Sequence, residues 1–269
     1  MYFLIGLGIS FISIVWSIIH LRQSAVNYLD PVGVAVVFGG TAAVAVMILP
    51  WSMLPEIKDA FRRLFGNRKV DMKILNHECL ELVKNLQAGQ TEYTPPNRTI
   101  AYQTLADGVE LIGLGFTPEK IHTILEERVH HWMLRKQVVS GAIRSLAKYP
   151  PAFGLVGTVL GLVSLMRAIS EGASSTEAGF RMAVALVATL YGLLIANLFL
   201  NPAGEFIAKH AEEEKKAAEL SLEAILLAAE KVTLLEVQET LNSKVAPEHR
   251  ANLVGSFTAG ESETTGEAA

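Results

Sequence analysis

The sequence has few charges for its length, and over four long stretches it has none. Only 19% of its 269 residues are Asp, Glu, Lys or Arg, whereas a soluble domain carries about 25%. The charge-free stretches are residues 1–19, 31–55, 149–166 and 182–204. Each has about 18 residues or more, enough for a helix to cross a hydrocarbon core of about 30 Å. The sequence therefore predicts an integral membrane protein with four transmembrane helices.

Cysteine is scarce, and the common catalytic motifs are absent. Cys79 is the only cysteine, which excludes an intramolecular disulfide and a cysteine-rich metal site. There is no G-x-x-x-x-G-K-[ST] or G-x-G-x-x-G phosphate loop, no H-E-x-x-H pattern and no serine elbow. His130 and His131 are adjacent, so their side chains diverge on a helix. We therefore expect no enzyme activity, no bound metal and no cofactor.

Basic residues predict how the chain is oriented in the membrane. A basic cluster follows the second span directly, and its members are Lys58, Arg62, Arg63, Arg68, Lys69 and Lys73. Such a cluster stays on the cytoplasmic side. Residues 51–148 are then inside, the short link 167–181 is outside, and both termini are cytoplasmic.

The segment between the second and third spans predicts helices throughout. Apolar residues recur at helical spacing, as at Leu75, Cys79 and Leu82. Thr117-Pro118-Glu119 is a helix start, and Pro150-Pro151 ends or kinks the long helix that follows. No stretch alternates with period two, so we expect no sheet. The predicted fold class is an all-α membrane protein with a large helical cytoplasmic insert between spans two and three and a cytoplasmic C-terminal helix.

These boundaries divide the chain into five predicted parts. They are a transmembrane hairpin (1–54), the helical insert (55–148), a second transmembrane hairpin (149–204), a tail helix (205–246) and a disordered tail (247–269). The last part is rich in Gly, Ser, Thr and Glu, a composition that buries little apolar surface.

Small residues repeat at helical spacing in the last two spans. They are Gly154, Gly157 and Gly161 in the third span, and Ala188, Gly192 and Ala196 in the fourth. In lipid, small residues let helix backbones approach closely. Two interpretations stay open: ordinary packing within one chain, or close-packed helices around a partner or a pore.

Polar side chains within the spans are few. No Asp, Glu, Lys or Arg lies inside any predicted span, and Thr41, Thr158 and Thr189 supply hydroxyl groups. A threonine in a membrane helix often bonds back to its own helix. Proton and ion relays usually need an ionisable group. If the chain conducts an ion, a second polypeptide must therefore provide the carboxylate.

Several segments, in order along the chain, resemble the MotA/PomA family of flagellar motor stator subunits, part of the MotA/TolQ/ExbB proton channel superfamily. They are Leu29-Asp30-Pro31 with 36–41 (VVFGGT), 107–127 in the insert, 151–162 (PAFGLVGTVLGL) in the third span, 182–192 (MAVALVATLYG) in the fourth, and Asn201-Pro202. The resemblance covers roughly residues 1–240. Two spans precede the insert here, whereas ExbB and TolQ have one, which favours the stator branch.

The resemblance implies a motor in the bacterial inner membrane that serves motility and chemotaxis. Five subunits would surround two copies of a MotB-like partner, a single-span protein that binds peptidoglycan and supplies an intramembrane Asp. Ion flow would turn the pentamer, and the insert would push the rotor switch protein. Alternatives are a MotA-like or ExbB/TolQ-like motor for a non-flagellar machine, or a non-conducting membrane scaffold.

The resemblance also implies roles for particular residues. Thr158 and Thr189 would line the ion pathway, and Pro151 and Pro202 would couple ion passage to conformation. The small residues Gly154, Gly157, Gly161, Gly192 and Ala196 would pack around the partner. The charged stretch with which the family meets its rotor is not matched here; Lys84 and Glu92 are the candidate replacements.

The coupling ion is expected to be H⁺ rather than Na⁺. In the sodium-driven proteins that this chain resembles, the fourth span has Thr-Thr before Leu-Tyr-Gly, and here the pair is Ala188-Thr189. Sodium exchanges its hydration water for several oxygen ligands, and a methyl group at position 188 offers none. We therefore include Ala188 with Thr158 and Thr189 in the predicted ion pathway.

Overall fold

The computed structural model describes residues 2–20, 28–65, 70–90 and 92–252, and all of its regular elements are helices. The α-helices are α1 (Tyr2–His20), α2 (Pro31–Ile48), α3 (Leu54–Phe65), α4 (Met72–Gln87), α5 (Ile100–Gly113), α6 (Pro118–Leu146), α7 (Tyr149–Ser170), α8 (Ser175–Leu194), α9 (Asn201–Ala229) and α10 (Leu234–Ser243). A π-helix (Ile195–Leu200) joins α8 to α9, and short 3₁₀ turns lie at Trp51–Met53 and Pro247–His249. No strand occurs among these residues, which confirms the predicted all-α fold.

The chain forms two compact units. The first consists of residues 1–67 and 136–209, and the second of residues 68–135 and 210–269. Their boundaries differ from the predicted parts, because α6 and α9 each contribute to both units.

The long apolar helices all pass through the first unit. Among the described residues, Pro31–Ile48 and stretches within the helical runs Pro118–Ser170 and Ser175–Ala229 are long and apolar enough to cross a membrane. Ile5–His20 in α1 is equally apolar but shorter. The chain is thus a multi-pass membrane protein, and the first of its four predicted spans, residues 1–19, stays a prediction.

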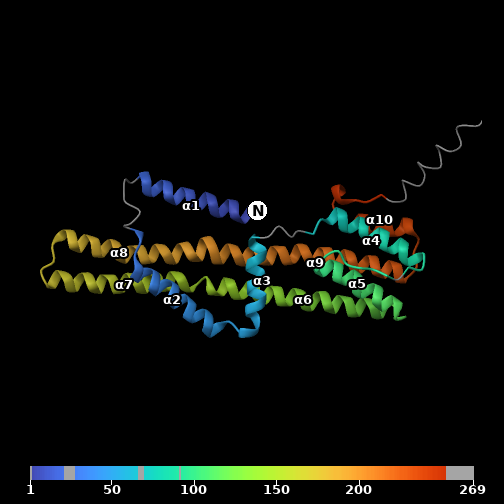
Figure 1. Cartoon of the computed structure of the whole chain (residues 1–269), viewed down its shortest axis with the longest axis horizontal. Helices are drawn as coiled ribbons and strands as arrows, with labels where there is room; N and C mark the ends of the chain where they lie inside the picture. The colour runs from blue at the N-terminus through green and yellow to red at the C-terminus, as the bar shows by residue number, and fades with distance from the viewer. Residues whose placement is uncertain (1, 21–27, 66–69, 91, 253–269) are drawn as a thin grey trace, which may run out of the picture. The chain divides into compact units, whose positions relative to one another are not determined.

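Helices α7 and α8 run side by side and antiparallel, joined by a short turn (Figure 1). Their contact is made by glycine and alanine. A Cβ atom added at Gly161 would lie 2.5 Å from Ala185 Cβ, and one at Gly154 would lie 3.0 Å from Thr189 Cα. Only a hydrogen atom fits at these positions, so the glycines set the distance between the two helices.

The prolines lie where helices meet. Pro150 and Pro151 occupy the first turn of α7, directly after α6 ends at Leu146, as the sequence predicted. Pro202 follows the π-helix, in which the Asn201 N–H bonds to Ala196 O, five residues back. Pro202 lacks an N–H and its ring crowds the preceding turn. The wider π turn gives that ring room.

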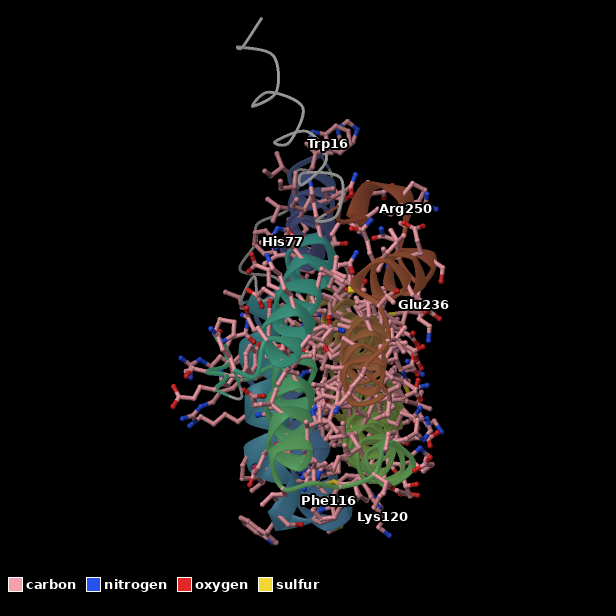
Figure 2. All side chains as sticks on the ribbon, turned by 90° about the vertical axis from the view of Figure 1, so that its right-hand side faces the viewer. Trp16, His77, Phe116, Lys120, Glu236 and Arg250 are labelled. Atoms are coloured by element: carbon pink, nitrogen blue, oxygen red, sulfur yellow. The ribbon has the colours of Figure 1, made fainter. Side chains whose placement is uncertain are left out.

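The second unit has a core formed by α4, α5, α10, the first part of α6 and the second part of α9. Its fully buried large side chains include Leu75, Leu80, Leu105, Ile121, Leu125, Leu220, Ile225 and Leu241. Polar and charged side chains cover the outside, including His77 on α4, Lys120 on α6 and Glu236 on α10, all exposed to solvent (Figure 2). The periodic apolar residues of the predicted insert therefore form a helical core.

Two predictions about the C-terminal region are wrong. The single tail helix is interrupted, because Lys231 has φ +57° and Thr233 caps a new helix, α10. Residues 247–252 are ordered: Asn242 donates to Ala251 O and accepts from Ala251 N, at 2.8 and 2.9 Å. The side-chain amide of Asn242 thus satisfies both the N–H and the C=O of Ala251. Residues 253–269 lie outside the described part of the chain.

We predict that the second unit loses stability at alkaline pH through Cys79. Burial raises the pKa of this thiol from 9.0 to about 12, and burial also raises the pKa of Tyr93 and Tyr102. Below pH 9 both the folded and the unfolded chain keep the thiol proton, so its contribution is fully present. Above that, only the unfolded chain loses it, and stability falls by about 1.4 kcal/mol per pH unit until the folded thiol titrates.

The measurement is urea unfolding of the purified full chain between about pH 8 and about pH 11. Cys79→Ala should flatten the alkaline slope and leave the part due to the tyrosines. An unchanged slope in Cys79→Ala would contradict the prediction, as would fast reaction of a thiol reagent with the folded protein.

Candidate functional site

Three helices of the first unit meet at Ala188. A Cβ atom added at Gly33 in α2 would lie 3.2 Å from Ala188 Cβ, and one added at Gly157 in α7 would lie 2.7 Å from it. The Ala188 side chain is only 1% exposed. Packing therefore gives a reason for a small residue here that is independent of any ion. Ala188 was assigned to the ion pathway from sequence, and that assignment stays a prediction.

The hydroxyl groups of Thr158 and Thr189 meet one turn from this contact. Their oxygens are 2.5 Å apart. Thr158 Oγ1 also lies 3.0 Å from Ala185 O and 3.1 Å from Gly154 O, and Thr189 Oγ1 lies 3.3 Å from Gly154 O. Both side chains are partly exposed, and no Asp, Glu, Lys or Arg belongs to either helix between residues 149 and 166 or 182 and 204. The pair can exchange hydrogen bonds with water or with an acid supplied from outside the chain.

Thr41 differs from this pair. Its hydroxyl donates to Val37 O, one turn back in α2, at 2.6 Å. This is the back-bonding that a threonine in a membrane helix commonly makes. Thr158 makes a similar bond to Gly154 O, but only Thr158 and Thr189 also contact each other across two helices.

The predicted packing residues lie between helices of the same chain. Gly154, Gly157 and Gly161 contact α8, while Gly192 lies against the backbone of Pro150 and Pro151. Ala196 is buried in the π-helix. These contacts are the intramolecular packing that the sequence left open as one interpretation, and packing around a partner stays a prediction.

Asp30 and Tyr191 form a contact that sequence reasoning missed. The Asp30 carboxylate caps α2, accepting from Val32 N at 3.1 Å and Gly33 N at 2.7 Å. The Tyr191 hydroxyl accepts from Asp30 N at 3.1 Å and donates to Tyr28 O. The start of α2 is thereby fastened to the last turn of α8. An Asp before a Pro is a capping signal that could have been read from the sequence.

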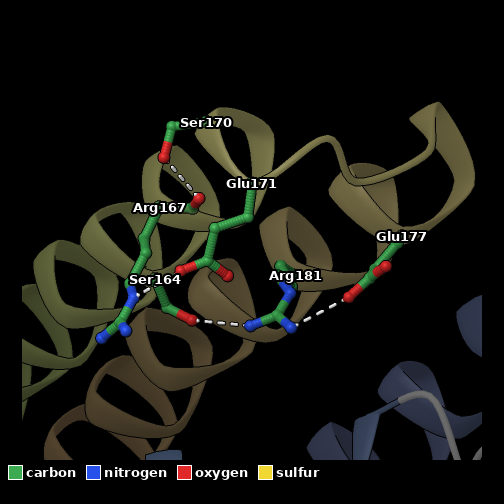
Figure 3. Close-up of polar contacts among 6 residues, drawn as sticks. All are labelled: Ser164, Arg167, Ser170, Glu171, Glu177 and Arg181. Atoms are coloured by element: carbon green, nitrogen blue, oxygen red, sulfur yellow. Dashed lines mark hydrogen bonds and ion pairs between the residues drawn. The ribbon is translucent and has the colours of Figure 1, made fainter.

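Charged side chains gather at the α7–α8 turn (Figure 3). The Arg181 guanidinium donates to Ser164 Oγ on α7 and to Glu177 on its own helix, at 2.9 Å each. Arg167 pairs with Glu171 at 2.9 Å. Each cation at this end of the hairpin therefore has an acid beside it, and Arg181 joins the two helices.

Lys84 and Glu92, the candidate rotor contacts, lie in the second unit. Lys84 is in the last turn of α4, and Glu92 is in the loop between α4 and α5. Both side chains are exposed. The prediction that they meet a rotor is unchanged by this placement.

We expect Tyr191→Phe to destabilise the first unit. Loss of the hydroxyl leaves Asp30 N and Tyr28 O without their bonds to it in a partly buried place, which costs about 1–3 kcal/mol. The measurement is the midpoint of thermal unfolding in detergent, with Tyr149→Phe as the control for removing a phenol oxygen from a half-buried tyrosine. Equal midpoints for the two variants would show that the fastening contributes nothing.

Comparison with known proteins finds similarity to one family. The sequence model of the MotA/TolQ/ExbB proton channel family matches residues 96–219. Motility protein A of Borreliella burgdorferi is 32% identical over 150 residues, a match that spans 56% of either protein. Motility protein A of Treponema phagedenis is 27% identical over 207 residues, covering 77% of this chain and 79% of that protein. Motility protein A of Cereibacter sphaeroides is 26% identical, covering 82% and 85%.

Solved structures share the fold over nearly the whole chain. The structure of C. jejuni MotAB superposes with a TM-score of 0.83 at 16% identity, covering 94% of this chain and 98% of that one. The flagellar MotAB stator complex from Bacillus subtilis gives 0.81 at 21% identity, covering 94% and 100%. The chain is thus similar to the MotA/TolQ/ExbB proton channel family over residues 96–219, and to Motility protein A over most of its length.

Proposed function

We propose that this chain is the ion-conducting stator subunit of a bacterial flagellar motor. It couples ion flow across the inner membrane to rotation, as a pentamer around a dimer of a MotB-like partner. Its relatives are Motility protein A, and one solved structure of the same fold is a flagellar MotAB stator complex. Both termini and the second unit would face the cytoplasm, because the basic residues after α2 favour that side.

The observation that supports this function best is the Thr158–Thr189 pair. Two hydroxyls lie 2.5 Å apart at the α7–α8 contact, partly exposed. Threonine hydroxyl groups do not take up and release a proton by themselves. A proton pathway through this pair therefore needs a titratable group beside it. A partner aspartate brought to this place would complete the pathway, with the threonines holding it and its water. This chain would therefore supply the hydroxyl groups of the ion site, and the partner would supply its carboxylate.

The two prolines would serve as pivots beside this site. Pro151 starts α7, and Pro202 follows the π-helix, so both interrupt regular helix at a junction. Gly192 packs on the backbone of Pro150 and Pro151. A change at Thr189, less than one turn away from Gly192, would thus reach the proline junction by direct contact.

The chain alone should be ion-silent. Asp30 is the acid nearest to Ala188, and both of its carboxylate oxygens already accept backbone bonds that cap α2. The measurement is proton flux into vesicles that contain the purified chain alone, and then the chain with its single-span partner. Flux is expected only with the partner, and Thr158→Val should reduce it.

Appreciable flux through the chain alone would overturn the proposal. Asp30→Asn identifies the source of such a flux, because it keeps the shape of the cap while removing the proton carrier. A complex that conducts but does not restore swimming in a stator-deleted cell would exclude the flagellar assignment.

The coupling ion is proposed to be H⁺. A proton needs one carboxylate and a few hydrogen-bonding groups, whereas sodium needs several oxygen ligands at once. The α7–α8 contact offers two hydroxyls, and Ala188 between them and α2 offers none. The electrical energy released on crossing the membrane does not distinguish H⁺ from Na⁺, because either cation gains about 2.3 kcal/mol per 100 mV.

Motor speed should therefore be insensitive to sodium. The measurement is the rotation rate at fixed proton-motive force while external Na⁺ is replaced by K⁺. A constant rate is expected. A stall on sodium removal that is reversed by adding sodium would show that backbone carbonyls or other hydroxyls supply the missing ligands.

A further inference from the structure

Helices α6 and α9 approach very closely at Gly204, two residues after Pro202. A Cβ atom added at Gly204 would lie 2.6 Å from Arg144 Cγ and 3.3 Å from Ser140 O, both in α6. Gly204 is buried. A Cβ atom here would strike the Arg144 side chain and crowd the Ser140 carbonyl, so this close approach favours glycine.

A buried hydrogen bond lies at the same point. Ser140 Oγ donates to Gly204 O at 2.9 Å, and the Ser140 side chain is 3% exposed. The bond joins two helices that are more than sixty residues apart in sequence. Because it is directional, it fixes how far one helix can slide along the other, which apolar packing alone does not.

The surroundings make this contact rigid. Helix α3 contributes to the apolar cluster that α6 and α9 form here, whose buried members are Ala60, Val139, Ile143, Ala203 and Ile207. Arg144 lays its aliphatic stem over Gly204 and reaches Glu205 at 3.1 Å. The Glu205 side chain is 69% exposed and that of Arg144 is 41% exposed, so their ion pair adds little. Close packing and the Ser140 bond therefore dominate.

The position of this contact along the chain gives it a role. The described chain passes from the first unit to the second within α6, at residues 135 and 136, and within α9, at residues 209 and 210. Both helices continue unbroken through these points. Two separate helices bend and slide under load, whereas a close-packed pair moves as one body.

We propose that Ser140 and Gly204 are positioning residues that lock α6 to α9 as one stiff linkage for torque. Through this linkage the rotation produced in the membrane helices is delivered to the second unit and so to the rotor. The proposal rests on the stator function proposed above. It assigns the transmission of torque to a contact that lies outside the ion pathway and is distinct from the proline junctions.

Gly204→Ala tests the proposal in cells that carry the complete stator complex. The added methyl group would strike the Arg144 side chain and crowd the Ser140 carbonyl, which strains the contact between α9 and α6. Gly141→Ala is the matched control, because it adds the same methyl group to α6 where nothing lies within 4 Å. The measurement is the torque step contributed by each stator unit, read from bead rotation at high and low load. Proton flux through vesicles of the same complex is measured in parallel.

Gly204→Ala is expected to lose roughly twofold or more of its high-load torque step, because overpacking displaces the helices, while low-load speed and proton flux stay native. Gly141→Ala should match the native protein throughout. Arg144→Ala removes the Cγ atom that the new methyl would strike, so Gly204→Ala with Arg144→Ala should recover torque. Ser140→Ala adds no bulk and should lower the high-load step in the same direction, which keeps the test open if Gly204→Ala fails to assemble.

Native high-load steps in both assembled Gly204→Ala and Ser140→Ala would overturn the proposal. Loss of proton flux together with torque in an assembled variant would also overturn it, because the contact would then act on conduction. Failure of the stator function itself is a different result, since the native complex would then neither conduct nor restore swimming.

Discussion

The close approach of α7 and α8 is the constraint on which the rest of the membrane unit depends. Glycines on α7 face the alanines and Thr189 of α8, so the helix backbones come together with only hydrogen atoms between them. In lipid such packing, rather than hydrophobic burial, holds helices together. This spacing brings Thr158 and Thr189 within hydrogen-bonding distance. It also leaves a surface at Ala188 on which Gly33 of α2 fits.

Rigid and interrupted segments alternate along the helices that leave this contact. Regular α-helix is broken at the α6–α7 junction, where Pro150 and Pro151 begin α7, and at the π-helix that precedes Pro202. Directly beyond them, the Ser140–Gly204 contact holds α6 and α9 together. In the stator function that we propose, a pivot beside a stiff pair would turn a small change near Thr189 into a displacement of both helices. In a bundle of regular helices without such a pivot, the same change would be spread along the whole length of the helices.

Much of the fold follows from patterns that are local in sequence. Charge-free runs of about 20 residues leave few alternatives to membrane helices. Apolar spacing over α4 to α6 predicted the helical core of the second unit, and Thr117-Pro118 marked the start of α6, which begins at Pro118. The prolines also marked the helix junctions, because proline acts on its own backbone and needs no distant partner.

Tertiary structure decided everything that depends on which helices meet. The sequence could not say whether the glycines pack within the chain, nor that Asp30 and Tyr191 would fasten α2 to α8. It also missed the order at residues 247–252, because that order depends on the side-chain amide of Asn242, in α10, which bonds to the backbone of Ala251. Composition and spacing determine what a segment can be, since they act through the segment's own backbone and solvent. Contacts between segments depend on register in three dimensions, which is set only when the helices have packed.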